Sequence, residues 1–148
     1  MKLFIDLKSA FDTIDPHILV KKLHYYGIQG NALQILSSYL TNRKQIIRSD
    51  GVVSVLLNVV CGVPQGSVLG PLLFILYIND IHRCCKLDAL LFADDAVLTM
   101  SHESVKVLQS KFNKEVARLH DWFITNKLTL NLKKTKFMFF SKLKNKKK

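Results

Sequence analysis

The pattern of apolar and polar positions predicts short strands and helices along the whole chain. Residues 1–6 alternate as in a short strand. A helix is expected between Asp15 and Gly27, because Asp caps the first turn, Pro16 fits the first helical position and Gly ends helices. Asn31 is expected to cap a second helix, whose leucines recur at helical spacing: Leu33, Leu36 and Leu40.

Two hairpins are also predicted. Residues 44–49 and 52–60 flank Asp50-Gly51, which is a strong signal for a two-residue hairpin turn. The second hairpin joins two apolar runs on either side of Asp94-Asp95, namely 87–93 and 96–100.

The remaining pattern completes a mixed fold. A loop at 62–67, rich in turn residues, leads into an apolar helix at about 68–80. Ser101 is expected to cap a long amphipathic helix reaching Phe123, and two further strands are expected at 128–132 and 136–140. This order predicts an α+β fold, with a largely antiparallel sheet and helices packed on one face.

Composition adds to this picture an excess of positive charge, which favours an anionic partner. The 148 residues suit one domain, and 49% hydrophobic content excludes disorder for most of the chain. A net charge of +11 fits a nucleic acid or an anionic membrane surface as partner. Residues 142–148 carry five lysines and are expected to form a basic disordered tail after a domain at 1–141.

The cysteines do not indicate a secreted protein, and no targeting segment is visible. The three cysteines cannot all pair with one another, and adjacent Cys84 and Cys85 lack the spacing of a zinc site. No signal peptide is visible, and the longest apolar run, 68–78, falls short of the roughly 20 residues that span a bilayer. The protein is therefore expected in the nucleus or cytoplasm.

Three carboxylates are candidates for a metal site. Asp94-Asp95 lies at a predicted hairpin tip, where both side chains can reach solvent, and Asp6 ends the first strand. A sheet that places the first strand beside this hairpin would gather these acids, and Mg²⁺ is bound by a few carboxylates plus substrate phosphates. Ordinary turn chemistry is the alternative for the Asp pair.

The loop at 62–66 does not match a nucleotide-binding P-loop, because it lacks the terminal Gly-Lys-Ser/Thr. Pro64 fixes its own φ, and Gly66 would permit close approach of another backbone. A simple turn between strand and helix is the alternative interpretation.

These segments together resemble the palm motifs of reverse transcriptases. The four matching motifs are FIDLKSAFD (4–12), GVPQGSVLGP (62–71), FADD (92–95) and NLKKT (131–135). Trp122 and Asn126 precede the fourth, as is usual in this group. The Ala before the Asp pair and the long second motif resemble non-LTR retrotransposons, notably jockey-like elements, more than retroviruses. The resemblance covers nearly the whole chain.

The resemblance implies a role for each acid. Asp6, Asp94 and Asp95 would be the catalytic triad and, with the Leu7 carbonyl, would hold two Mg²⁺ ions. The ions would activate a primer 3′-hydroxyl and stabilise the leaving pyrophosphate.

It also implies a nucleotide-binding set. Phe11 would be the aromatic gate under the incoming sugar, Gln65 and Gly66 would contact nucleotide and template, and Lys134 would lie near the triphosphate. A plain core role for Phe11 and a solvated Lys134 are the alternatives.

The implied activity is RNA-directed DNA polymerisation with an RNA template, a DNA primer and dNTPs. Only five residues precede Asp6, so the domain is expected to hold the palm and part of the fingers, truncated at both ends from a longer polyprotein. Two other interpretations remain: a catalytically silent retroelement remnant that only binds nucleic acid, and a Mg²⁺ phosphohydrolase.

Overall fold

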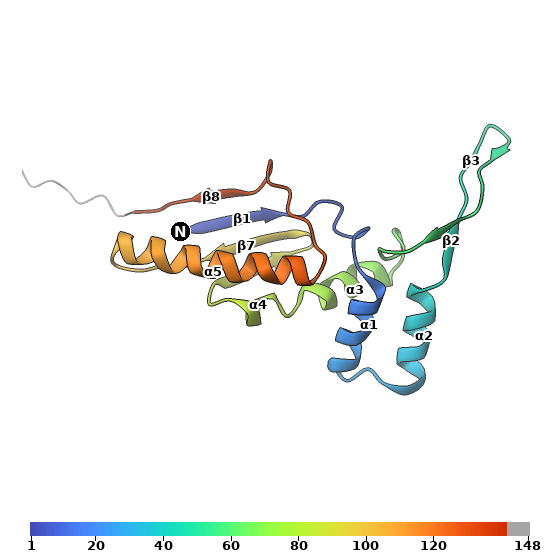
Figure 1. Ribbon diagram of the computed structural model, residues 1–148, viewed down its shortest axis with the longest axis horizontal. Helices are drawn as coiled ribbons and strands as arrows, with labels where there is room; N and C mark the ends of the chain where they lie inside the picture. Colours follow the sequence, from blue (N-terminus) through green and yellow to red (C-terminus); the bar gives the residue numbers. More distant parts are fainter. Residues whose placement is uncertain (142–148) are drawn as a thin grey trace, which may run out of the picture.

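The centre of the molecule is a four-stranded antiparallel sheet, with strand order β6-β7-β1-β8. The computed structural model describes residues 1–141. The first strand of the sequence is central, so long-range pairing builds the sheet (Figure 1). Its strands are β1 (Lys2–Asp6), β6 (Asp88–Phe92), β7 (Asp95–Thr99) and β8 (Lys136–Met138).

Three helices pack on one face of this sheet, which confirms the predicted α+β architecture. They are α3 (Leu69–Ile78), α4 (Ile81–Cys84) and α5 (Val105–Thr125). Alternation along the strands turns buried Ile5, Ala96 and Leu98 toward these helices. In α5, apolar residues at helical spacing form the buried stripe: Leu108, Phe112, Leu119 and Phe123.

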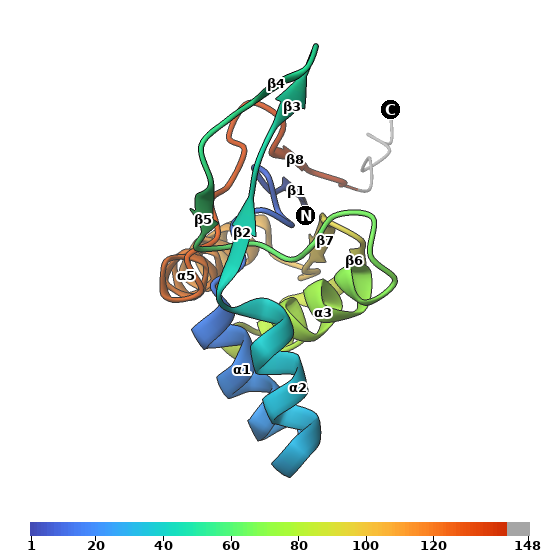
Figure 2. The ribbon, with the colours of Figure 1, turned by 90° about the vertical axis from the view of Figure 1, so that its right-hand side faces the viewer.

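The segment between β1 and α3 extends to one side of the sheet. The helices α1 (Pro16–Tyr25) and α2 (Gly30–Leu40) run downward in Figure 2, and a β-arm projects in the opposite direction. Both turn residues of the arm, Asp50 (φ 48°) and Gly51 (φ 79°), have the positive φ that a tight hairpin needs. The arm contains β2 (Arg43–Gln45), β3 (Arg48–Ser49), β4 (Val52–Val53) and β5 (Leu57–Val59).

The predicted start of α1 is confirmed in detail. One carboxylate oxygen of Asp15 accepts hydrogen bonds from the backbone N–H groups of His17 (2.9 Å) and Ile18 (3.1 Å). These bonds satisfy two of the donors that a helix leaves free at its first turn.

Three local predictions were wrong. Asn31 lies inside the first turn of α2, which begins at Gly30. Ser101 lies before α5, which begins only after Ser104, because an extended segment separates β7 from the helix. Residues 128–132 form no strand; a single bridge from Leu130 to Leu7 replaces it, since the chain turns immediately afterwards.

The predicted basic tail at 142–148 lies outside the described residues. Among residues 1–141, no helix combines the length and the apolar character that a bilayer crossing requires.

Candidate active site

Asp6 and Asp95 lie directly opposite each other on β1 and β7. Met1 and Met100 exchange two backbone hydrogen bonds, of 2.8 and 3.1 Å, so they are a hydrogen-bonded pair. Along an antiparallel ladder such pairs alternate with non-hydrogen-bonded ones, and Asp6–Asp95 is the fifth pair after Met1–Met100. The Asp6–Asp95 pair is therefore non-hydrogen-bonded, the kind with Cα atoms about 4.5 Å apart and the closest side chains. Two like charges in such a pair repel one another, so this position suits a bound cation.

Asp94 lies next to this pair, in the two-residue loop of the β6–β7 hairpin. The loop consists of Ala93 and Asp94, because Phe92 and Asp95 are the last paired residues. The tip thus lies one residue earlier than the predicted Asp94-Asp95, and Asp95 is the first residue of β7. Ala93 has a φ of 51°, which is unusual for a residue with a side chain and is needed at this turn position. The structure thus brings all three predicted acids to one end of the sheet, with Asp94 half-buried and Asp95 exposed.

The backbone of Leu7 faces this hairpin. The Asp6 carbonyl accepts from the Asn131 N–H and the Lys8 N–H donates to Thr129, both at 2.8 Å on the β8 side. Because backbone groups alternate in direction along an extended strand, the carbonyl of buried Leu7 points the other way, to the β7 side of β1. This orientation makes the Leu7 carbonyl a candidate oxygen ligand beside the hairpin.

The side chain of Asp6 has partners from the turn at 131–135. Asn131 donates through Nδ2 to one oxygen at 2.7 Å, and the Lys134 ammonium lies 3.5 Å from the other. The turn itself is closed by the N–H groups of Lys134 and Thr135, which donate to the Asn131 carbonyl. Sequence reasoning placed Lys134 near the site but missed Asn131 as a site residue; an Asn opening a polar turn before a strand was the available signal.

Phe11 lines a cavity of about 370 Å³ beside the acidic hairpin. Its ring packs on Phe74, with centroids 4.8 Å apart. Phe92 and Ala93 form another part of the wall, so the cavity reaches the residue next to Asp94. The half-buried ring therefore packs against the core on one side and lines the cavity on the other.

The loop that follows β5 lies against the segment that follows β1. The N–H of Gly62 donates to Ile14 at 2.7 Å, and that of Val63 donates to Phe11 at 2.9 Å. A Cβ on Gly62 would lie 2.8 Å from the Asp12 Cα, and the φ of Gly62 is 80°. Only glycine fits here without displacing the backbone.

This contact corrects the expectation about Gly66. Its φ of 75° suits glycine, but no atom lies within 4 Å of the position a Cβ would take, so the close approach occurs at Gly62 instead. Gln65 is held through its side-chain amide, which donates to Asp12 Oδ1 at 2.5 Å. Gln65 and Gly66 are both exposed, as is Asp12.

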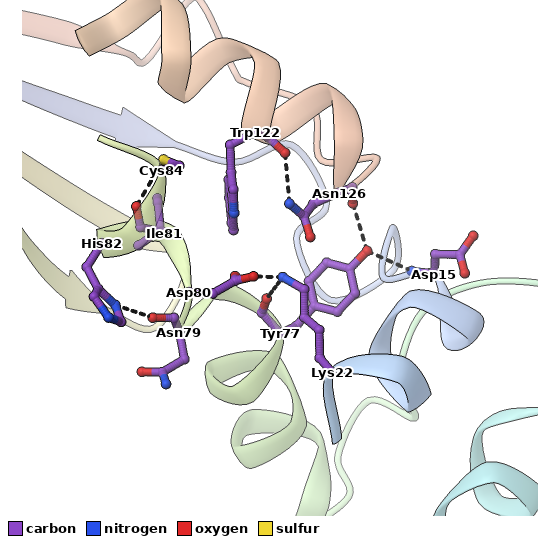
Figure 3. A network of polar contacts seen from close by, with 10 residues as sticks. All are labelled: Asp15, Lys22, Tyr77, Asn79, Asp80, Ile81, His82, Cys84, Trp122 and Asn126. Carbon is purple, nitrogen blue, oxygen red and sulfur yellow. Dashed lines mark hydrogen bonds and ion pairs between the residues drawn. The ribbon is translucent and has the colours of Figure 1, made fainter. Parts of the chain in front are cut away.

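A polar network centred on Tyr77 connects three helices behind the site (Figure 3). The Tyr77 hydroxyl donates to the Asn126 carbonyl at 2.7 Å and accepts from the Asp15 N–H at 3.4 Å. Burial raises the pKa of Tyr77 to about 12, so the hydroxyl stays protonated as a donor. The network thereby ties α3 to the start of α1 and the end of α5.

Lys22 extends this network. Its ammonium donates to the Tyr77 carbonyl at 2.6 Å and to Asp80 at 2.7 Å, and it lies 5.0 Å from the Trp122 ring (Figure 3). Burial lowers the pKa of Lys22, and the hydrogen bond to Asp80 opposes that effect. Trp122 and Asn126, which belong to the sequence resemblance, therefore contact Lys22 and Tyr77 in the network that joins the helices.

The donor chemistry at the sheet end fits a hard cation. Carboxylates and a backbone carbonyl are the oxygen ligands that Mg²⁺ binds in proteins. In the described part of the chain, no three His, Cys, Asp or Glu side chains are grouped closely enough to hold a metal by themselves. Further oxygen ligands would have to come from a substrate, as Mg²⁺ sites with few protein ligands require.

Known proteins resemble this chain in sequence and in fold. The family model described as "Reverse transcriptase (RNA-dependent DNA polymerase)" matches residues 1–147. The chain is 37% identical over 102 residues to the probable RNA-directed DNA polymerase from transposon X-element of Drosophila melanogaster, covering 66% of this chain and 11% of that protein. It is 32% identical over 139 residues to the probable RNA-directed DNA polymerase from transposon BS of the same species, covering 82% of this chain and 15% of that protein.

A more distant relative is the RNA-directed DNA polymerase from mobile element jockey of Drosophila melanogaster, at 26% identity over 88% of this chain and 15% of the relative. The chain thus spans about 11% to 15% of the length of these relatives.

Solved structures show the same fold. Telomerase from Candida albicans in complex with a fragment of telomeric RNA superposes with a TM-score of 0.74 at 16% identity, covering 95% of this chain and 28% of that one. Reverse transcriptases as a family use divalent metal ions. The match over nearly all residues, together with the acids at the sheet end, places this chain in the reverse transcriptase (RNA-dependent DNA polymerase) family.

Proposed function

We propose that this chain is the palm, with part of the fingers, of a non-LTR retrotransposon RNA-directed DNA polymerase. The enzyme would join dNTPs to a primer 3′-hydroxyl on an RNA template, in the nucleus or cytoplasm. The observation that carries the proposal is the register of β1 and β7, which sets Asp6 opposite Asp95 and beside Asp94. The names of the transposon relatives support the same assignment.

Asp6, Asp94 and Asp95, with the Leu7 carbonyl, are the proposed ligands of two Mg²⁺ ions. When bound, such ions activate the attacking hydroxyl and stabilise the leaving pyrophosphate. The protein's own contribution is to hold the carboxylates at a fixed spacing: β1 is paired on both sides, and the hairpin loop is only two residues long. Rigid strands position such groups more accurately than long loops do.

The nucleotide would lie between this acidic end and the loop at 62–66. Phe11, in the cavity wall beside Ala93, would limit the space under the sugar, so that a 2′-hydroxyl clashes. Gln65, fixed by Asp12, and Gly66 would contact the nucleotide and template. The Lys134 ammonium, 3.5 Å from Asp6, would offset the negative charge of the triphosphate.

A primer-extension assay tests the proposal. Residues 1–141 replace the palm of a related full-length polymerase, which supplies the fingers and thumb. The chimera should extend a DNA primer on an RNA template with Mg²⁺. Binding of primer–template without any extension, while the parent polymerase is active under the same conditions, would instead identify a silent remnant that only binds nucleic acid.

A further inference from the structure

Arg43 connects two parts of the chain that the proposed function uses together. It begins β2, shortly after α2 ends. Its Nε donates to the Leu40 carbonyl at 3.3 Å, and its Nη2 donates to the carbonyls of Cys61 (2.9 Å) and Gly62. Among the described residues it forms no ion pair with an acid, so backbone carbonyls are the partners of this charge.

The chemistry of this contact requires arginine. The guanidinium is planar and presents its N–H groups in a fixed fork, so one side chain can reach carbonyls on two separate segments. One of these carbonyls belongs to the last turn of α2, where the helix dipole favours a cation. A lysine ammonium would keep the charge, but it lacks the fork that spans both segments.

The two carbonyls at 61 and 62 open the loop that carries Gln65. On its other side, this loop is bonded to the segment after β1, through the Gly62 and Val63 N–H groups. The loop is therefore held from two directions, by Arg43 and by the backbone at 11–14. Without Arg43, only the contacts to the segment after β1 would hold it.

We propose that Arg43 is a positioning residue, whose hydrogen bonds hold the loop at 61–66 against the segment carrying Phe11 and Asp12. It would thereby set the spacing between Phe11 and Gln65, two of the side chains proposed to contact the nucleotide. The nucleotide part of this inference rests on the proposed function; the loop-holding part does not. Binding of Arg43 to a nucleic-acid phosphate is a different role that the same experiments separate from this one.

Hydrogen exchange on the 148-residue chain tests the loop-holding part and needs no catalytic activity. Arg43→Ala and Arg43→Lys should both speed exchange of the Gly62 and Val63 amides by about tenfold or more, as expected for the loss of a charge-assisted hydrogen bond. Lys44→Ala is the matched control, because it removes an exposed neighbouring cation from the same strand. Unchanged exchange in Arg43→Ala, or equal acceleration in the control, would overturn the proposal.

Steady-state kinetics in the polymerase chimera tests the nucleotide part. Arg43→Ala and Arg43→Lys should raise the KM for dNTP by about tenfold with kcat within about twofold. The reason is that the bound nucleotide and the transition state lose the same binding energy. Affinity for primer–template should not change. If Arg43→Lys retained the normal KM, or if both Arg43 variants lost primer–template affinity instead, Arg43 would be a phosphate contact and the positioning role would be wrong.

Discussion

Asn131 and Asp6, which are 125 positions apart, are joined by two hydrogen bonds: the Asn131 N–H donates to the Asp6 carbonyl at 2.8 Å, and Asn131 Nδ2 donates to the Asp6 carboxylate at 2.7 Å. One residue therefore fixes both the backbone and the side chain of the acid that ends β1. The same Asn closes the turn that brings Lys134 to the site. The geometry of the proposed centre thus depends on a residue outside the acidic triad.

Asn131→Ala should weaken both the fold and the activity. The Asp6 carboxylate loses a charge-assisted hydrogen bond, so unfolding free energy should fall by about 2 kcal/mol in urea titrations. In the polymerase chimera, the less constrained carboxylate should lower kcat by about tenfold or more. Thr129→Ala is the control, because Thr129 contributes only its backbone carbonyl to this region. Equal effects of the two variants would contradict the role of Asn131.

Glu115 should make the chain sensitive to acid. It is buried on α5, and its carboxylate accepts hydrogen bonds of 2.8 Å from the Lys86 N–H and from Arg118. The Lys86 N–H, with Arg118, holds the pKa of Glu115 below its ordinary value of 4.5, although burial opposes this. Because the pKa is lower in the folded state, this stabilisation is complete above pH 4.5 and is lost as the pH falls through the folded-state value.

Thermal unfolding between pH 2 and 7 checks this. Glu115→Gln should lower the Tm by several degrees at pH 7, and the difference from the unsubstituted chain should shrink in acid. Glu103→Gln is the matched control, since Glu103 is the other glutamate of the chain and is exposed. A deficit for Glu115→Gln that is constant over the whole pH range would refute the linkage.

Phe11→Val should relax the choice of sugar. Removing the ring enlarges the cavity beside Ala93, so the chimera should incorporate ribonucleotides about tenfold more readily relative to deoxyribonucleotides. Competition assays with paired dNTP and rNTP measure this ratio. Phe139→Val, at an exposed ring outside that cavity, should leave the ratio unchanged. A loss of stability in Phe11→Val with normal discrimination would assign Phe11 to the core alone.

Much of the fold could be predicted from local signals. Asp15-Pro16, Asp50-Gly51 and the apolar stripe of α5 each favour one structure strongly, and each forms where expected. Helix starts without such signals were harder to predict. Ser101 and Ser104 are equivalent as capping residues in sequence, and α5 begins after Ser104, whose side chain makes no capping hydrogen bond.

The site could be predicted in part. The two acidic positions indicated a shared sheet end, and the register of β1 with β7 agrees. Gly62 and Gly66 could not be distinguished from sequence, because only the approach of the Asp12 backbone separates them. Asn131 and Arg43 were missed for the same reason: their partners are backbone carbonyls and a carboxylate that are distant in sequence.

The isolated 148-residue chain should bind nucleic acid without extending a primer. Its charge of +11 should attract any phosphate backbone, with log K falling against log salt by about 0.7 to 0.9 per phosphate contacted. Catalysis also needs orientation, which is worth on the order of 7–11 kcal/mol, and the chain spans only 11% to 15% of its relatives. Extension that disappears in Asp94→Asn would prove this prediction wrong.

The central claim is that the acids at the end of β1 and β7 are the catalytic centre. Single-turnover primer extension by the chimera, comparing Asp94→Asn with Asp88→Asn, tests it most directly. Asp88 is an exposed acid at the opposite end of the same hairpin, paired with Thr99. Asp94→Asn should abolish extension while primer–template affinity is retained, and Asp88→Asn should extend normally. Extension by Asp94→Asn at the rate of the unsubstituted chimera would contradict the claim.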